Sequence, residues 1–147
     1  MGADHLAHAL DDEFHKARSP DWSKVTVPFL SAANWGALGI HLRGNIEAFT
    51  RAASKEKWLE AHGLEHWTHF YTDYGVSLQK RFFAHYLKGD ANGWKEKQAP
   101  VTLQIRHPGN RFVQREEREW PLARTQWTKF YLDPASHGLR TDAPGNG

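Results

Sequence analysis

The sequence has no cysteine and no long hydrophobic run, and these two absences exclude several classes of protein. Without cysteine there can be no disulfide framework, no thiolate nucleophile and no cysteine-ligated metal. No apolar run approaches the roughly 20 residues that a membrane span requires, and the first residues lack the apolar segment of a signal peptide. We therefore expect a cytoplasmic protein with no membrane partner.

An excess of charge of one sign is also missing. The 147 residues carry 19 Lys and Arg against 17 Asp and Glu, and the signs are mixed within short segments such as KEKWLE and REERE. A nucleic-acid-binding surface needs clustered cations, so we expect no nucleic-acid partner. Tryptophan is abundant instead, with 7 residues, and such side chains need a core or an interface to cover them. The composition therefore favours a folded chain.

Residues 25–98 alternate between the patterns of strands and helices. Residues 25–33 are a continuous apolar run typical of a strand buried on both faces of a parallel sheet, and Pro28 marks its beginning or a bulge. From Ile40 the apolar residues recur at helical spacing, and residues 57–61 predict a second strand. This strand–helix–strand order predicts a βαβ crossover.

A histidine-rich loop follows the second predicted strand and leads into a long helix. The loop reads HGLEHWTHF over residues 62–70, and Gly63 argues against a helix there. Beyond it, apolar residues at helical spacing predict a helix that ends at Gly89. We expect its aromatic stripe to lie in the core. The stripe consists of Tyr71, Tyr74, Leu78, Phe82 and Tyr86, widened by Phe83 and Leu87.

After a linker over residues 90–100, the pattern changes to strands. Residues 101–107 and 126–132 alternate between apolar and polar, and residues 117–123 predict an edge strand that contains Pro121. The charged run 115–119 predicts a solvated turn or strand face. Three strands cannot easily close a sandwich or barrel, so this half resembles a β-domain that is cut short.

This order of parts resembles the CocE/NonD hydrolase family, which includes cocaine esterase, α-amino acid ester hydrolases and Xaa-Pro dipeptidyl-peptidases. The resemblance covers about residues 20–134. Its motifs are Val27-Pro28 opening a strand, the loop with Trp35, the helix end Leu87-Lys88-Gly89, and the stretches LQIRHPG and EWPLARTQWTKFYLDP. Family members carry an α/β-hydrolase domain with a helical cap, followed by a jelly-roll β-domain.

The resemblance implies an α/β fold, namely the C-terminal end of an α/β-hydrolase sheet followed by the beginning of a jelly-roll-like β-domain. The implied divisions are a lead-in over residues 1–24, the end of the catalytic domain over 25–98, the start of a β-rich domain of the Xaa-Pro dipeptidyl-peptidase C-terminal type over 99–134, and a disordered tail over 135–147.

The family mechanism uses a Ser-His-Asp triad, and the resemblance implies that His66 is its histidine. His62 and His69 are neighbours that a shifted alignment would select instead. Family members place the acid directly after the Trp or Tyr of the loop that follows the first strand. Here that loop reads NWGALG and has no carboxylate; the nearest carboxylates in sequence, Glu47 and Asp73, do not match the motif.

The nucleophile is absent from the sequence. No G-x-S-x-G motif occurs, and Ser77 lies within the pattern of the long helix. The family order places the nucleophile and oxyanion hole upstream of Met1. We therefore predict a C-terminal segment of a serine hydrolase that acts on ester or amide bonds, as dipeptidyl-peptidases do, and that is inactive alone. Its partner would be a small-molecule ester, amide or peptide substrate, and no cofactor is expected.

Other interpretations of the same residues remain open. The chain can instead be a degenerate, non-enzymatic binding or assembly module of the same fold. His66 can instead cap the following helix. The histidine cluster can also bind a metal, although HGLEH is not the H-E-x-x-H motif and Glu65 is the only carboxylate close to it in the sequence. Trp35 either lines an acyl pocket or packs its own loop.

Overall fold

The computed structural model describes residues 2–36 and 41–143, apart from the side chains of His5 and His66. Six strands and eight helical segments are assigned within these residues. The strands are β1 (Phe29–Asn34), β2 (Lys57–His62), β3 (Val101–His107), β4 (Arg111–Glu117), β5 (Tyr131–Asp133) and β6 (Gly138–Arg140). The helical segments are α1 (Gly2–Ala7), α2 (Glu13–Lys16), η1 (Trp22–Lys24), α3 (Leu42–Arg51), α4 (His66–Phe70), α5 (Asp73–Lys88), α6 (Trp94–Lys97) and η2 (Pro108–Asn110).

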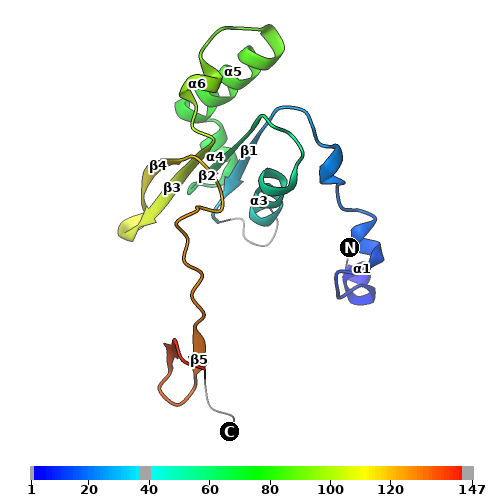
Figure 1. Cartoon of the computed structure of the whole chain (residues 1–147), viewed down its shortest axis with the longest axis vertical. Coiled ribbons are helices and arrows are strands. Elements are labelled where there is room, and N and C mark those ends of the chain that lie inside the picture. Colours follow the sequence, from blue (N-terminus) through cyan, green and yellow to red (C-terminus); the bar gives the residue numbers. More distant parts are fainter. Residues whose placement is uncertain (1, 37–40, 144–147) are drawn as a thin grey trace.

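The centre of the molecule is a mixed four-stranded sheet in the order β1-β2-β3-β4 (Figure 1). The pairs β1–β2 and β2–β3 are parallel, and β4 is antiparallel to β3. The predicted α/β class is thus confirmed for this part. The sequence predicted that residues 101–117 begin a β-rich domain. In the structure these residues form β3 and β4, which belong to the same sheet as β1 and β2. A jelly-roll domain stays a prediction.

The sheet is covered on both faces. On one face, Phe49 of α3 packs against Leu59 of β2 and Leu103 of β3. On the other face, a cluster of Leu78 and Phe82 of α5 packs with Trp58 of β2 and Trp94 of α6. Because successive side chains of a strand point to opposite faces, even-numbered residues of β2 point towards α5 and odd-numbered ones towards α3. This alternation aims Glu60 and His62 at the α4–α5 side.

Pro28 marks the beginning of the first strand, which is one of the two roles predicted for it. β1 starts directly after Pro28, which has no N–H to donate to a strand ladder. Val27 is 64% exposed outside the sheet. The second strand agrees with its prediction and extends one residue further, to His62.

Helix α5 ends where the sequence predicts, because Gly89 adopts the left-handed conformation with a φ of 72°. The aromatic stripe is only partly core, however. Leu78 and Phe82 are buried, whereas Tyr71 lies in the turn before α5 and Leu87 lies on its outer side, and both are mostly exposed. The prediction that the whole stripe is buried is therefore wrong.

Both ends of the described chain lie away from the central sheet, and β5 and β6 form a separate hairpin (Figure 1). The predicted strand over 117–123 is wrong, because β4 ends at Glu117. Of the predicted strand over 126–132, only the end belongs to β5. The strand β6 lies inside the tail for which the sequence predicted no regular structure.

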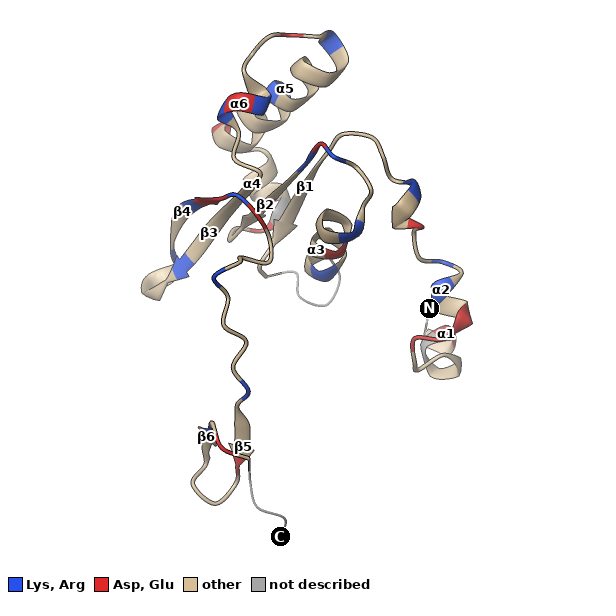
Figure 2. Ribbon diagram, viewed as in Figure 1, with Lys and Arg blue, Asp and Glu red and all other residues tan. Residues whose placement is uncertain are grey.

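Acidic and basic residues are interspersed along the same elements, as on α6 (Figure 2). Residues 115–117 of the charged run lie in β4, and Arg115 Nε lies 2.8 Å from Glu117 Oε1. The prediction of a solvated strand face holds for Arg115 but not for Glu117, whose side chain is 10% exposed. Among the described residues, no helix is both long and apolar enough to cross a membrane.

Candidate active site

The candidate site lies where the parallel strands β1 and β2 end. Asn34 and His62 are the last residues of these strands and face each other in the register of the sheet. Their exposed fractions are 5% and 2%. In α/β folds, ligands bind at the carboxyl ends of the strands. Two buried polar side chains at this edge therefore define a candidate functional site.

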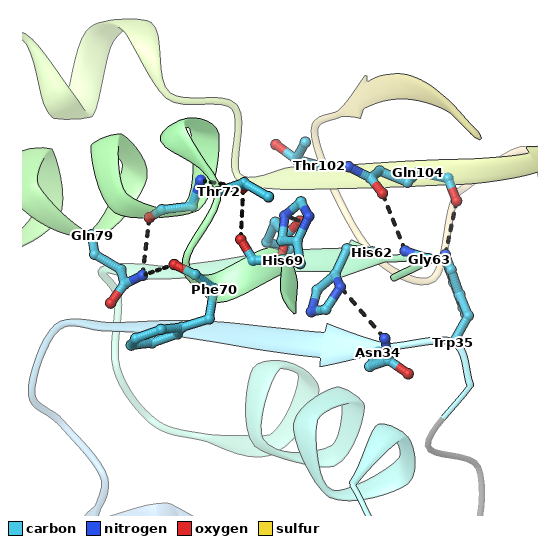
Figure 3. Close-up of polar contacts among 12 residues, drawn as sticks. Asn34, Trp35, His62, Gly63, His69, Phe70, Thr72, Gln79, Thr102 and Gln104 are labelled. Atoms are coloured by element: carbon cyan, nitrogen blue, oxygen red, sulfur yellow. Dashed lines mark hydrogen bonds and ion pairs between the residues drawn. The ribbon is translucent and has the colours of Figure 1, made fainter. Parts of the chain in front are cut away.

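Asn34 joins the loop after β1 to the histidine of β2. Its Oδ1 accepts a hydrogen bond from the backbone N–H of Gly36 at 2.8 Å, and its Nδ2 lies 3.5 Å from His62 Nδ1. Figure 3 shows Asn34 and His62 turned towards each other from the two strands. The Gly36 N–H can only donate, so the Asn34 oxygen points to Gly36 and its NH₂ group points to His62.

A second histidine lies directly on the first. The ring centroids of His62 and His69 are 4.1 Å apart and the rings are within 12° of parallel. His69 Nε2 lies 3.0 Å from Glu60 Oε1, and both side chains are buried. Glu60 occupies the middle of β2, flanked by Ala32 of β1 and Thr102 of β3.

Burial controls the protonation of the groups around this pair. It raises the pKa of the Glu60 carboxyl, and the contact with His69 opposes that rise. Burial also raises the pKa of Tyr74 to about 12, and the nearby Glu60 charge adds to this effect. The ring of Tyr74 lies 5.2 Å from that of His69. Tyr74 therefore stays protonated at neutral pH.

Gln104 of β3 holds the loops after both strands. Its backbone oxygen accepts from Trp35 Nε1 at 2.8 Å, and its side-chain Oε1 accepts from the N–H of Gly63 at 3.1 Å. Trp35 also packs against the core on the α3 face. Of the two roles predicted for Trp35, the structure favours packing of the loop. A Cβ on Gly63 would overlap the ring of Phe112, so a larger residue there would have to displace that ring.

A cleft of about 540 Å³ opens beside the histidine pair. Glu60, His62 and His69 line one part of it. Its other walls are mostly apolar and come from β1, α4 and α5, including Leu30, Phe70 and Leu78. A small apolar group could therefore lie against the imidazoles and the apolar walls of the cleft.

The three candidate histidines do not lie in one loop. His62 ends β2, and His66 and His69 belong to helix α4. His66 is the first residue of helix α4, so the expectation of no helix after Gly63 is wrong. The side chain of His66 is outside the described part of the structure, and its catalytic role stays a prediction. His62 and His69, the two alternatives, are brought together.

The two nearest carboxylates in sequence, neither of which matches the family motif, lie on α3 and α5. Glu47 pairs with Arg51 at 3.1 Å on α3, which covers the opposite face of the sheet. Asp73 is the first residue of α5. Ser77 lies inside α5 and is exposed, as expected for a helical serine without a nucleophile elbow.

Sequence reasoning missed Asn34 and Glu60. The signal for Glu60 was present, because a single carboxylate stands in the middle of a strand that is otherwise buried. Residues 37–40 of the loop after β1 lie outside the described residues. Within the described part, no group of three or more His, Asp or Glu side chains is arranged to hold a metal ion.

No protein-family model and no curated protein matches the chain. Among solved structures, two crystal structures of a CocE/NonD family hydrolase from Staphylococcus aureus match with a TM-score of 0.87 and 34% sequence identity. The resemblance to the CocE/NonD hydrolases is confirmed. The match covers 95% of this chain but 25% of that hydrolase. This chain thus spans about a quarter of the CocE/NonD hydrolase that it matches.

Proposed function

We propose that the chain is the C-terminal segment of a CocE/NonD-type serine hydrolase and supplies the histidine for acyl transfer at an ester or amide bond, including dipeptidyl-peptidase-like cleavage. The similarity to a hydrolase over 95% of the chain carries this proposal. The buried histidine at the carboxyl ends of β1 and β2 supports it. The substrate would be a small-molecule ester, amide or peptide.

The histidine has one task in this chemistry. It accepts the proton of the serine hydroxyl as the hydroxyl attacks the acyl carbon, and it returns the proton to the leaving group. The resemblance assigns this task to His66. His62 is a second candidate, because it lies at the end of β2, faces Asn34 and lines the cleft.

The nucleophile would come from the other part of the hydrolase, so the chain alone should be inactive. The sequence offers no G-x-S-x-G motif, and Ser77 is exposed inside helix α5. We expect the 147-residue chain to hydrolyse p-nitrophenyl acetate no faster than an equal concentration of free histidine. Turnover that is lost in His66→Ala would contradict inactivity.

A chimera tests the proposed role directly. The matching quarter of the S. aureus hydrolase is replaced by this chain, and hydrolysis of p-nitrophenyl acetate is measured. If the chimera is active, substitution of the catalytic histidine by Ala should lower kcat by about a hundredfold to ten-thousandfold. His66→Ala and His62→Ala are compared, with His85→Ala on α5 as the matched control. A chimera that loses activity in neither site variant would overturn the proposal.

A second function has one observation in its favour. At the position facing His62, Asn34 presents an amide and not the carboxylate that a triad requires. This favours a degenerate, non-enzymatic binding or assembly module. That function predicts a chimera that is folded but inactive, and an isolated chain that is monomeric and unfolds cooperatively.

A further inference from the structure

We propose that Asn34 is a positioning residue that holds His62 in the tautomer with its proton on Nε2. This proposal rests on the proposed function and specifies which ring nitrogen of His62 carries the proton. Its test measures the tautomer alone, so the outcome does not depend on whether the chain takes part in hydrolysis.

The backbone N–H of Gly36 fixes the orientation of the Asn34 amide. The backbone N–H of Gly36 donates to Asn34 Oδ1 at 2.8 Å, which leaves the NH₂ group of Asn34 facing His62 Nδ1 at 3.5 Å. An NH₂ group can only donate, so Nδ1 must be the accepting, unprotonated nitrogen. The distance is long for a hydrogen bond, but the two side chains are buried and Asn34 cannot reverse its amide without losing the Gly36 contact.

The stacked pair of imidazoles supports a neutral His62. His69 lies parallel to it at 4.1 Å and also contacts Glu60, so a positive charge on His69 has a carboxylate partner. Protonation of both imidazoles would place two positive charges against each other across this stack. This arrangement favours an uncharged His62, which must then choose one tautomer.

The chosen tautomer matters for proton transfer. In a serine hydrolase triad, the acid accepts the proton of Nδ1, and the lone pair of Nε2 takes the proton of the serine. In a serine protease, replacing the triad Asp by Asn lowers kcat by about 10⁴, because the imidazole is held in the wrong tautomer. With its proton on Nε2, His62 has no lone pair on that nitrogen and cannot accept the proton of the serine there. A carboxylate at position 34 would accept from Nδ1–H and reverse the tautomer.

The test is NMR of the 147-residue chain with ¹⁵N-labelled histidine at about pH 8.5, above the ordinary imidazole midpoint of about 6.5. Two-bond ¹H–¹⁵N correlations show which ring nitrogen carries the proton, and His62→Gln assigns the signals. We expect Nε2–H in the unmodified chain and Nδ1–H in Asn34→Asp. Asn45→Asp, on α3 at the opposite face, is the matched control and should leave the pattern unchanged.

An Nδ1–H tautomer in the unmodified chain would overturn the proposal, and so would an unchanged tautomer in folded Asn34→Asp. Circular dichroism shows whether each variant folds. If Asn34→Asp does not fold, Asn34→Ala removes the donor without adding a charge. In that variant we expect a mixture of the two tautomers, and persistence of pure Nε2–H would show that Asn34 does not set it. In the active chimera, Asn34→Asp should raise kcat only if His62 is the base.

Discussion

At the scale of single residues, Glu60 is the group that the fold must accommodate at a cost. Its side chain is almost completely buried in the middle of β2, where Glu60 Oε1 lies 3.0 Å from His69 Nε2. A carboxylate in such a place is unfavourable in its ionised form, which is why burial raises its pKa above the ordinary value. The group therefore makes the stability of the chain depend on pH.

The sign of this dependence follows from proton binding. Glu60 binds its proton more tightly in the folded chain, so the folded state holds more protons in the window above the ordinary Glu value. The contribution of Glu60 to stability is complete below that value and is lost as the pH rises through the folded pKa. The free energy of unfolding should therefore fall towards neutral pH, by about 1.4 kcal/mol for each unit by which the pKa is raised. Glu60→Gln should remove this decrease. Urea unfolding at several pH values measures the change.

Glu56→Gln is the matched control, because the surroundings of Glu56 lower its pKa whereas those of Glu60 raise it. The contact with Lys95 lowers the pKa of Glu56, so its contribution is present at neutral pH and is lost as the pH falls. Glu56→Gln should leave the decline towards neutral pH intact. If Glu60→Gln keeps that decline as well, the pKa of Glu60 is not raised by burial.

At the scale of elements, the close approach of α4 and α5 depends on Gly75. A Cβ at this position would overlap the backbone oxygen of His69 and lie 2.8 Å from that of Phe70. Thr72 ties the same junction together, since its hydroxyl oxygen accepts from the Gly75 N–H at 3.1 Å and its O–H donates to His69 O at 2.7 Å. The position of His69 over His62 thus depends on this glycine.

Gly75→Ala should therefore push α4 away from α5 and lower the free energy of unfolding by about 1–3 kcal/mol. Gly44→Ala in α3 is the matched control, because nothing lies within 4 Å of a Cβ there. It should raise stability by about 0.5–1 kcal/mol, as alanine restricts the unfolded chain and favours the helix. Thermal and urea unfolding measure both variants. Equal effects of the two substitutions would show that Gly75 is not under steric constraint.

Elements with a hydrophobic period were predictable from the sequence, and the others were not. β3 and α5 have a regular apolar pattern, and α5 also has a strong end signal at Gly89. β4 was missed because it is mostly exposed and is held by backbone pairing with β3. The candidate site was also only partly predictable from the sequence. Its histidines were visible in the sequence, but the contact of Asn34 with His62 exists only through the register of two parallel strands.

At the scale of the whole molecule, one edge of the sheet is unpaired beside the apolar cleft. Within the described residues, β1 is at the edge of the sheet, paired only with β2. Beside it, Phe83 and Tyr71 line the apolar cleft and are 51% and 74% exposed. A sheet edge next to an apolar patch promotes association. If the proposed function holds, the remaining part of the hydrolase would cover this surface.

We therefore expect the isolated chain to bind the dye ANS and to elute above its monomer mass of 16.9 kDa in size-exclusion chromatography. Phe83→Glu combined with Tyr71→Glu should reduce both, because charges in the cleft oppose burial of its walls. Trp127→Glu is the matched control: Trp127 is 85% exposed but is not among the cleft residues, so its loss should leave the association unchanged. A monomer that binds no ANS would contradict the need for a covering segment and would favour the binding module over the hydrolase segment.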